Sequence, residues 1–120
     1  MDQPQPNSRL KELHRLVAQI PSGRVTSYAA LGRALTHPVS GFLVGKWMAV
    51  APEGVPWWRV IKANGEIALF KRDPALGMEQ VRKLQAEDVP FLLEHQVAIE
   101  EVFWDPEDAS PAESTPGSVY

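Results

Sequence analysis

Proline and glycine divide the first two thirds of this chain into short segments. Breaks occur at residues 21–23, at Pro38, at 51–56 and at the Asn64-Gly65 pair. Proline cannot continue a helix interior and glycine favours turns, so each break ends the element before it. With 120 residues, the chain is therefore predicted to form one small domain of short elements around a single core.

Three helices are predicted before residue 51. Apolar residues recur at three- and four-residue steps over 8–20, the spacing of a helix with one buried face. A second helix is predicted over 28–35 with Ser27 as its cap, and a third over about 39–50. The residue before Pro38 disfavours helix, so the two helices are joined by a tight turn. Such a pair is a candidate helix-turn-helix.

The Asn64-Gly65 pair predicts a wing beside these helices, because Asn-Gly is a strong short hairpin signal. Segments 59–61 and 67–69 would then pair as strands, and a further helix is predicted over 77–87, followed by short extended segments. The predicted fold class is mainly α with a small β-hairpin, as a winged helix-turn-helix DNA-binding domain. The expected domains are a flexible N-terminus at 1–7, the winged helix-turn-helix domain at 8–104 and an acidic disordered tail at 105–120.

The net charge of −3 hides a segregation of charge along the chain. All twelve lysines and arginines lie at or before Lys83, together with six of the fifteen acidic residues, and the other nine acidic residues follow it. A basic body is typical of a protein that binds nucleic acid. The acidic remainder either limits indiscriminate DNA binding or only keeps the protein soluble, and the sequence leaves both open.

The chain contains no cysteine, which excludes a disulfide framework, thiolate metal sites and a cysteine nucleophile. His14, His37 and His95 are scattered without metal-ligand spacing, and no serine-histidine arrangement is evident. We therefore expect no metal and no cofactor. No apolar run reaches the roughly 20 residues of a membrane span, and the first residues do not read as a secretory signal. We expect a cytoplasmic protein with no membrane partner.

Residues 56–61 read Pro-Trp-Trp-Arg-Val-Ile. They resemble the Pro-Cys-His-Arg-Val motif of the O6-alkylguanine-DNA alkyltransferases, with Trp57 in the position of the cysteine. Further family blocks are matched in the same order and at similar spacing, at 20–28, 44–45 and 64–65, so the likeness covers about 10–90. With a tryptophan in place of the cysteine and Lys-Arg-Asp at 71–73, the chain resembles the alkyltransferase-like branch. That branch binds alkylated guanine without dealkylating it.

The chemistry of this loss can be derived from the residues. Alkyl transfer needs a thiolate nucleophile activated by a neighbouring base such as histidine. Trp57 offers only an indole N–H donor, and Trp58 cannot act as the base. The resemblance implies a protein that is not an enzyme and that binds O6-alkylguanine in double-stranded DNA through the minor groove. It would flip the damaged base into a pocket and flag it for nucleotide excision repair proteins.

The resemblance also implies roles for individual residues. Tyr28 would push on the phosphate of the target nucleotide, while Trp57 and Arg72 would contact the flipped base in the lesion pocket. Phe42 stands where the family has an arginine that fills the gap left by the base, and an apolar wedge can also unstack DNA. Core packing of Phe42, and of Trp57 with Trp58, remains the alternative. The chain has two extra residues between Gly65 and the block that carries Arg72.

Other residues of the motifs are expected to touch the DNA backbone or to support the fold. The candidates for backbone contacts, which fix position without reading sequence, are Ser27, Arg33, Lys46 and Lys62. The expected structural residues of the motif are Pro56, Trp58 and Arg59. We expect a monomer. An alternative function is a winged-helix transcriptional regulator reading undamaged DNA, although the third helix carries few of the side chains that read base edges.

Overall fold

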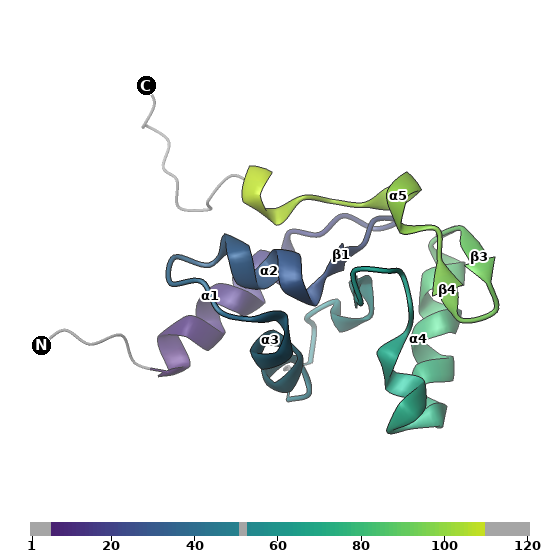
Figure 1. Ribbon diagram of the computed structural model, residues 1–120, viewed down its shortest axis with the longest axis horizontal. Coiled ribbons are helices and arrows are strands. Elements are labelled where there is room, and N and C mark those ends of the chain that lie inside the picture. Colours follow the sequence, from purple (N-terminus) through teal and green to yellow (C-terminus); the bar gives the residue numbers. More distant parts are fainter. Residues whose placement is uncertain (1–5, 51–52, 110–120) are drawn as a thin grey trace, which may run out of the picture.

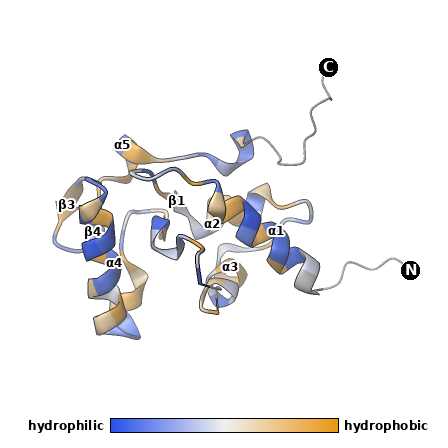
Figure 2. Ribbon diagram, turned by 180° about the vertical axis from the view of Figure 1, so that it is seen from behind, coloured by the Kyte–Doolittle hydropathy of each residue, from blue (hydrophilic) through white to orange (hydrophobic). Residues whose placement is uncertain are grey.

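Three short helices form one end of the protein (Figure 1). The computed structural model describes residues 6–50 and 53–109. The helices are α1 (Pro6–Ala18), α2 (Tyr28–Ala34) and α3 (Gly41–Met48), close to the bounds predicted from the apolar spacing. Hydrophilic and hydrophobic residues alternate along α1 in Figure 2, as expected for a helix that buries one face. No helix among the described residues could cross a bilayer.

Helices α2 and α3 form a helix-turn-helix, and each begins at a serine cap. The Ser27 hydroxyl accepts a hydrogen bond from the Ala30 amide at 3.0 Å, and the Ser40 hydroxyl accepts one from the Leu43 amide at 3.2 Å. The approach of the two helices requires Gly41, because a Cβ there would lie 2.9 Å from the backbone nitrogen of Ala29. A larger residue at this position would force the helices apart.

A short parallel pair of strands joins the two ends of the molecule. Strand β1 (Thr26–Ser27) pairs with β2 (Val60–Ile61), and β2 follows the 3-10 helix η1 (Trp57–Arg59). Because successive strand residues point to opposite sides, Val60 packs into the core between α1, α2 and α3, while Ile61 packs into a second core. The second core consists of Val25, Ile61, Ile67, Val81, Leu84, Val89 and Val97.

The other end is built on α4 (Pro74–Ala86), which packs against the 3-10 helix η2 (Ala68–Lys71). Asp73 caps α4 by accepting a hydrogen bond from the Leu76 amide at 3.1 Å. Strands β3 (Phe91–Leu93) and β4 (Gln96–Val97) form an antiparallel hairpin beside it.

The C-terminal segment returns across the molecule toward α2 (Figure 1). It contains α5 (Ile99–Val102) and the 3-10 helix η3 (Pro106–Asp108), and the Trp104 amide donates to the Val25 carbonyl at 2.8 Å. Residues 105–109 therefore pack on the domain, although they were expected to begin a disordered tail. The remainder of that predicted tail, and most of the predicted flexible N-terminus, lie outside the described residues.

The mainly helical, helix-turn-helix fold class is confirmed, but the predicted position of the hairpin is wrong. Residues 67–69 do not pair with 59–61, because β2 pairs with β1 and Ala68 begins η2. Asn64-Gly65 does form a tight turn, in which Gly65 has φ of 92° and donates to the Lys62 carbonyl at 2.8 Å. Beyond it the chain bridges to Gln96, and the small hairpin is β3 with β4. Residues 99–102, expected to be extended, are helical.

Candidate nucleic-acid interface

A cleft of about 430 Å³ brings together three predicted site residues from distant parts of the chain. Tyr28 begins α2, Trp57 begins η1, and Arg72 follows η2. The cleft is completed by Gly45, Met48, Ala49, Leu69, Asp73, Leu76 and Glu79. It combines aromatic, apolar and cationic groups, a surface suited to a planar aromatic ligand.

The consecutive residues Trp57 and Trp58 point in different directions. Their rings meet edge to face, with centroids 6.0 Å apart and planes at 88°. Trp57 packs beside the core of α1, α2 and α3 and lines the cleft, whereas Trp58 packs against the second core. The Trp58 indole donates to Glu87 Oε2 at 2.9 Å. A purely structural role in core packing therefore explains the position of Trp58, but it does not explain why Trp57 also lines the cleft.

Arg59, within the motif at 56–61, forms a largely buried ion pair with Glu87, which follows α4. Arg59 Nη2 lies 2.6 Å from Glu87 Oε2, and the two side chains are 15% and 13% exposed. Arg59 Nη1 also donates to the Ile20 carbonyl at 2.8 Å, and Glu87 Oε1 accepts from the Gly23 amide at 3.0 Å. Burial alone would raise the pKa of Glu87, but hydrogen bonds from Arg59, Gly23 and Trp58 outweigh it and lower the pKa.

The sequence did not single out Glu87 or Gln80 as partners of the motif. The buried Gln80 amide donates to the carbonyls of Trp58 at 3.0 Å and Val60 at 3.1 Å. This ties the motif to α4 directly. No local spacing signals such contacts, since these residues lie 20 or more positions from their partners. Pro56 is buried, so it and Arg59 both hold the motif in place.

Tyr28 and Arg72 are close enough to influence each other electrostatically. Burial raises the pKa of the Tyr28 hydroxyl, and the positive charge of Arg72 opposes that shift in part. The hydroxyl therefore stays protonated at neutral pH and available as a donor. Arg72 itself is exposed, and no described residue forms an ion pair with it.

Phe42 projects from α3 into solvent with 77% of its surface exposed. The alternative that it packs in the core is wrong. The Lys46 ammonium, one turn later on the same helix, lies 5.3 Å from the centroid of the Phe42 ring. Helix α3 therefore presents an aromatic ring and a cation together.

The structure separates the other candidates for phosphate contacts. Ser27 is only 4% exposed, and its hydroxyl caps α2. The predicted contact of its side chain with the DNA backbone is therefore wrong, and the role of Ser27 is structural. Arg33 Nε lies 3.3 Å from Glu107 Oε2, and Arg33 lines a second cleft rather than the one that contains Trp57. Lys62 is half-buried near the Asn64-Gly65 turn, and its Nζ lies 3.4 Å from Glu66 Oε1.

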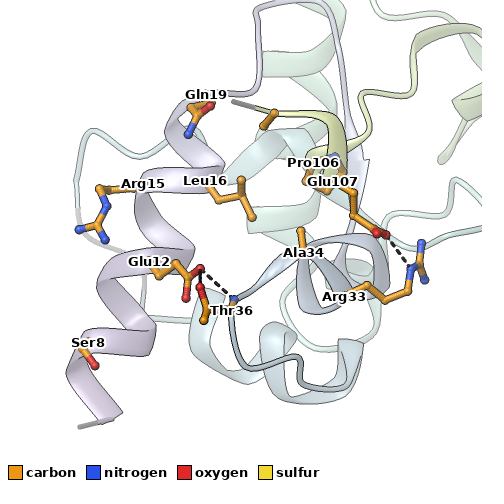
Figure 3. Close-up of a pocket in the computed structure, with 11 residues that line it drawn as sticks. Ser8, Glu12, Arg15, Leu16, Gln19, Arg33, Ala34, Thr36, Pro106 and Glu107 are labelled. Carbon is orange, nitrogen blue, oxygen red and sulfur yellow. Dashed lines mark hydrogen bonds and ion pairs between the residues drawn. The ribbon is translucent and has the colours of Figure 1, made fainter. Parts of the chain in front are cut away.

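A larger cleft, of about 820 Å³, lies between α1, α2 and η3 (Figure 3). Its acidic groups already have partners: Glu12 accepts hydrogen bonds from the Thr36 amide and hydroxyl, and Glu107 pairs with Arg33. None of the described residues that line this cleft is aromatic. Among the described residues, no group of three acidic or histidine side chains could hold a metal ion. The smaller cleft is therefore the better candidate site.

The comparisons with known proteins identify the family to which the chain is related. Residues 10–89 match the family model of the 6-O-methylguanine DNA methyltransferase DNA-binding domain. The chain is 32% identical over 99 residues to a DNA base-flipping protein of Vibrio parahaemolyticus, covering 81% of this chain and 96% of the relative. It is also 32% identical over 102 residues to alkyltransferase-like protein 1 of Schizosaccharomyces pombe, covering 79% and 93%.

A solved structure of a related protein has the same fold as this chain. The crystal structure of S. pombe Atl1 in complex with damaged DNA containing O6-carboxymethylguanine superposes with a TM-score of 0.75 at 27% identity. The match covers 84% of this chain and 98% of that one. The helix-turn-helix and the cleft beside it thus lie within a region of shared architecture.

Proposed function

The chain belongs to the family of the 6-O-methylguanine DNA methyltransferase DNA-binding domain, in its alkyltransferase-like branch, and we propose that it is a sensor of alkylated DNA. The absence of cysteine from the whole chain supports recognition without repair, because no thiolate is present to accept the alkyl group. The observation that carries the proposal is the cleft shared by Tyr28, Trp57 and Arg72.

In the proposed complex the O6-alkylguanine leaves the duplex and enters this cleft. Stacking on the Trp57 ring would contribute about 1–3 kcal/mol, and the Arg72 guanidinium would face the base as a cation. The protonated Tyr28 hydroxyl would donate to the phosphate of the flipped nucleotide. Flipping costs a few kcal/mol and less where pairing is weakened, so the alkylated base is extruded more easily than its normal neighbours.

Helix α3 would enter the minor groove and insert Phe42 where the base has left the stack. The exposure of this ring supports a wedge, because an apolar side chain is otherwise costly to leave in water. Lys46, beside the ring, would contact the DNA backbone, and Lys62 would do so from near the Asn64-Gly65 turn.

The bound lesion would then be passed to nucleotide excision repair proteins, since the chain has no cysteine to accept the alkyl group. We also propose that the protein acts as a monomer. The Arg33–Glu107 pair places Arg33 away from this cleft, and we leave it out of the proposed DNA contacts.

The test is a titration of two matched short duplexes, one with O6-methylguanine and one with guanine, at one fixed salt concentration. Tryptophan fluorescence follows binding, and recovery of intact O6-methylguanine checks that the methyl group stays on the base. We expect the lesion duplex to bind at least about tenfold more tightly, a difference of roughly 1.4 kcal/mol.

The variant Trp57→Phe should keep the fold, bind the lesion more weakly and lose most of the fluorescence change. Equal affinity for both duplexes would reject the sensor. A strong preference for one undamaged sequence would favour the winged-helix regulator.

A further inference from the structure

One wall of the cleft is formed by a segment that has little packing of its own. Leu69, Arg72 and Asp73 line the cleft, yet every residue from 71 to 75 is exposed. Exposed segments with few buried contacts open easily. Arg72 lies between η2 and Asp73, the cap of α4, so its position depends on how η2 is held against α4.

Phe70, in η2, directly precedes the exposed residues and, like Leu69, packs against the second core. A Cβ added at Gly77 would lie 3.0 Å from Cγ and Cδ1 of Phe70 and 3.1 Å from Cδ2. These nearly equal distances put Gly77 over the face of the ring rather than at its edge. The His95 ring stacks on Phe70 with centroids 3.7 Å apart and planes at 10°. The two neighbours must therefore occupy opposite faces of the phenylalanine.

Gly77 and His95, the two neighbours of the Phe70 ring, are each held by backbone hydrogen bonds. Gly77 lies in α4, where its amide donates to the Asp73 carbonyl at 2.9 Å. On the other side, the His95 carbonyl accepts from the Ile67 amide at 3.2 Å, and the Val97 amide donates to the Gly65 carbonyl at 2.8 Å. Glycine is a poor helix former, so its place inside α4 fits a position where a Cβ would strike the ring.

We propose that Phe70, clasped between Gly77 and His95, positions the segment that brings Arg72 to the cleft and thereby sets the preference for the alkylated base. Phe70 is a positioning residue: it does not line the cleft and acts through Arg72. The inference rests on the proposed function. Its physical basis is that a charged group senses a bound base only when it is held in place before binding.

The first experiment compares the affinities of the two duplexes for wild-type protein and for Phe70→Ala. We expect the ratio of the two affinities to fall about 3- to 30-fold, the range of coupling carried through packed side chains. Affinity for the plain duplex should stay within about twofold, because backbone contacts are untouched. Phe70→Tyr, which keeps the ring, should retain the preference, and His95→Ala should lose part of it.

The matched controls are Met78→Ala, adjacent to Gly77 on α4, and Leu92→Ala, on the same hairpin as His95. Both side chains are exposed and neither lines the cleft, so neither variant should change the ratio. An unchanged ratio in Phe70→Ala, or an equal loss of affinity for both duplexes, would overturn the clasp.

A second readout needs no DNA and separates the clasp from the proposed function. The amides of Arg72 and Asp73 donate to the Leu69 carbonyl at 3.0 and 2.8 Å, so their hydrogen exchange reports the order of the segment. Exchange at both amides should be faster in Phe70→Ala than in wild type or Met78→Ala. If exchange is unchanged, the clasp is wrong. If wild type fails to distinguish the duplexes, the proposed function is wrong and the exchange result alone decides whether the clasp orders the segment.

Discussion

Two adjacent tryptophans divide this protein into a supporting region and a candidate binding region. Trp58 belongs to a network in which Arg59, Glu87 and Gln80 all have hydrogen-bond partners inside the protein. Trp57 belongs to a cleft whose neighbouring cation, Arg72, pairs with no described residue. The difference shows that pairing, rather than residue type, distinguishes a side chain that supports from one that is available to a ligand.

The two regions meet at β2, so the residues that support the motif must hold this strand in a fixed position. Val60 and Ile61 face different cores, so a shift of this strand would disturb both. The Arg59–Glu87 pair and the Gln80 amide hold the same segment from α4 and the 20–23 turn. Trp57 is therefore presented to the cleft from a backbone that is fixed on its far side.

The largest effect should come from breaking the support, with Glu87→Gln. Removal of the charge leaves Arg59 buried beside a neutral partner, and we expect a loss of about 3 kcal/mol in the free energy of unfolding. Urea denaturation measures it. Glu100→Gln, an exposed change on α5, is the control and should cost almost nothing. A loss below about 1 kcal/mol would show that the pair adds little and that the two regions do not differ as argued.

The same pair should make the fold sensitive to acid. The pKa of Glu87 is lowered in the folded protein, so its stabilising contribution is present above the ordinary value of 4.5 and is lost as the pH falls through the lowered folded value. We expect the unfolding free energy of wild type to fall below pH 4.5 more steeply than that of Glu87→Gln. Urea titrations at a series of pH values measure both curves. Parallel curves would contradict the assigned shift.

Phe42→Ala tests the other region and should leave the support alone. The side chain is exposed, so the unfolding free energy should change by no more than about 0.5 kcal/mol. Binding of the O6-methylguanine duplex should weaken at least about tenfold, because nothing else on α3 would fill the gap in the stack. Leu92→Ala removes another exposed apolar side chain, on the β3–β4 hairpin, and should leave binding unchanged. Unfolding of Phe42→Ala would instead give this ring a role in the fold.

Local patterns predicted the first three helices to within about two residues at each end. The serine before the second helix, the break at Pro38 and apolar spacing are short-range signals. Helix α2 begins at Tyr28 as predicted, and α3 begins at Gly41, about two residues after its predicted start. The motif resemblance identified Tyr28, Trp57 and Arg72, which the fold brings into one cleft.

Long-range contacts explain what the sequence could not predict. The Asn64-Gly65 turn was recognised, but β2 took β1 as its partner because burial of Val60 and Ile61 on two sides outweighs a local hairpin. The partners Glu87 and Gln80, and the stacking of Phe70 on His95, depend on where α4 and the β3–β4 hairpin dock. No spacing in the chain encodes that docking.

The smallest effect on binding is expected for Lys46→Ala. This variant tests, within the binding region, whether Lys46 acts on the DNA backbone or on the lesion. Lys46 lies beside the Phe42 ring, so it could act on the lesion through the wedge or on the backbone through its charge alone. A backbone contact should weaken binding to both duplexes equally, by a few-fold, and reduce the dependence of log affinity on log salt by about 0.9. Titrations of both duplexes at several salt concentrations measure this, with Lys11→Ala on α1 as the control. A loss confined to the lesion duplex would instead make Lys46 part of the wedge.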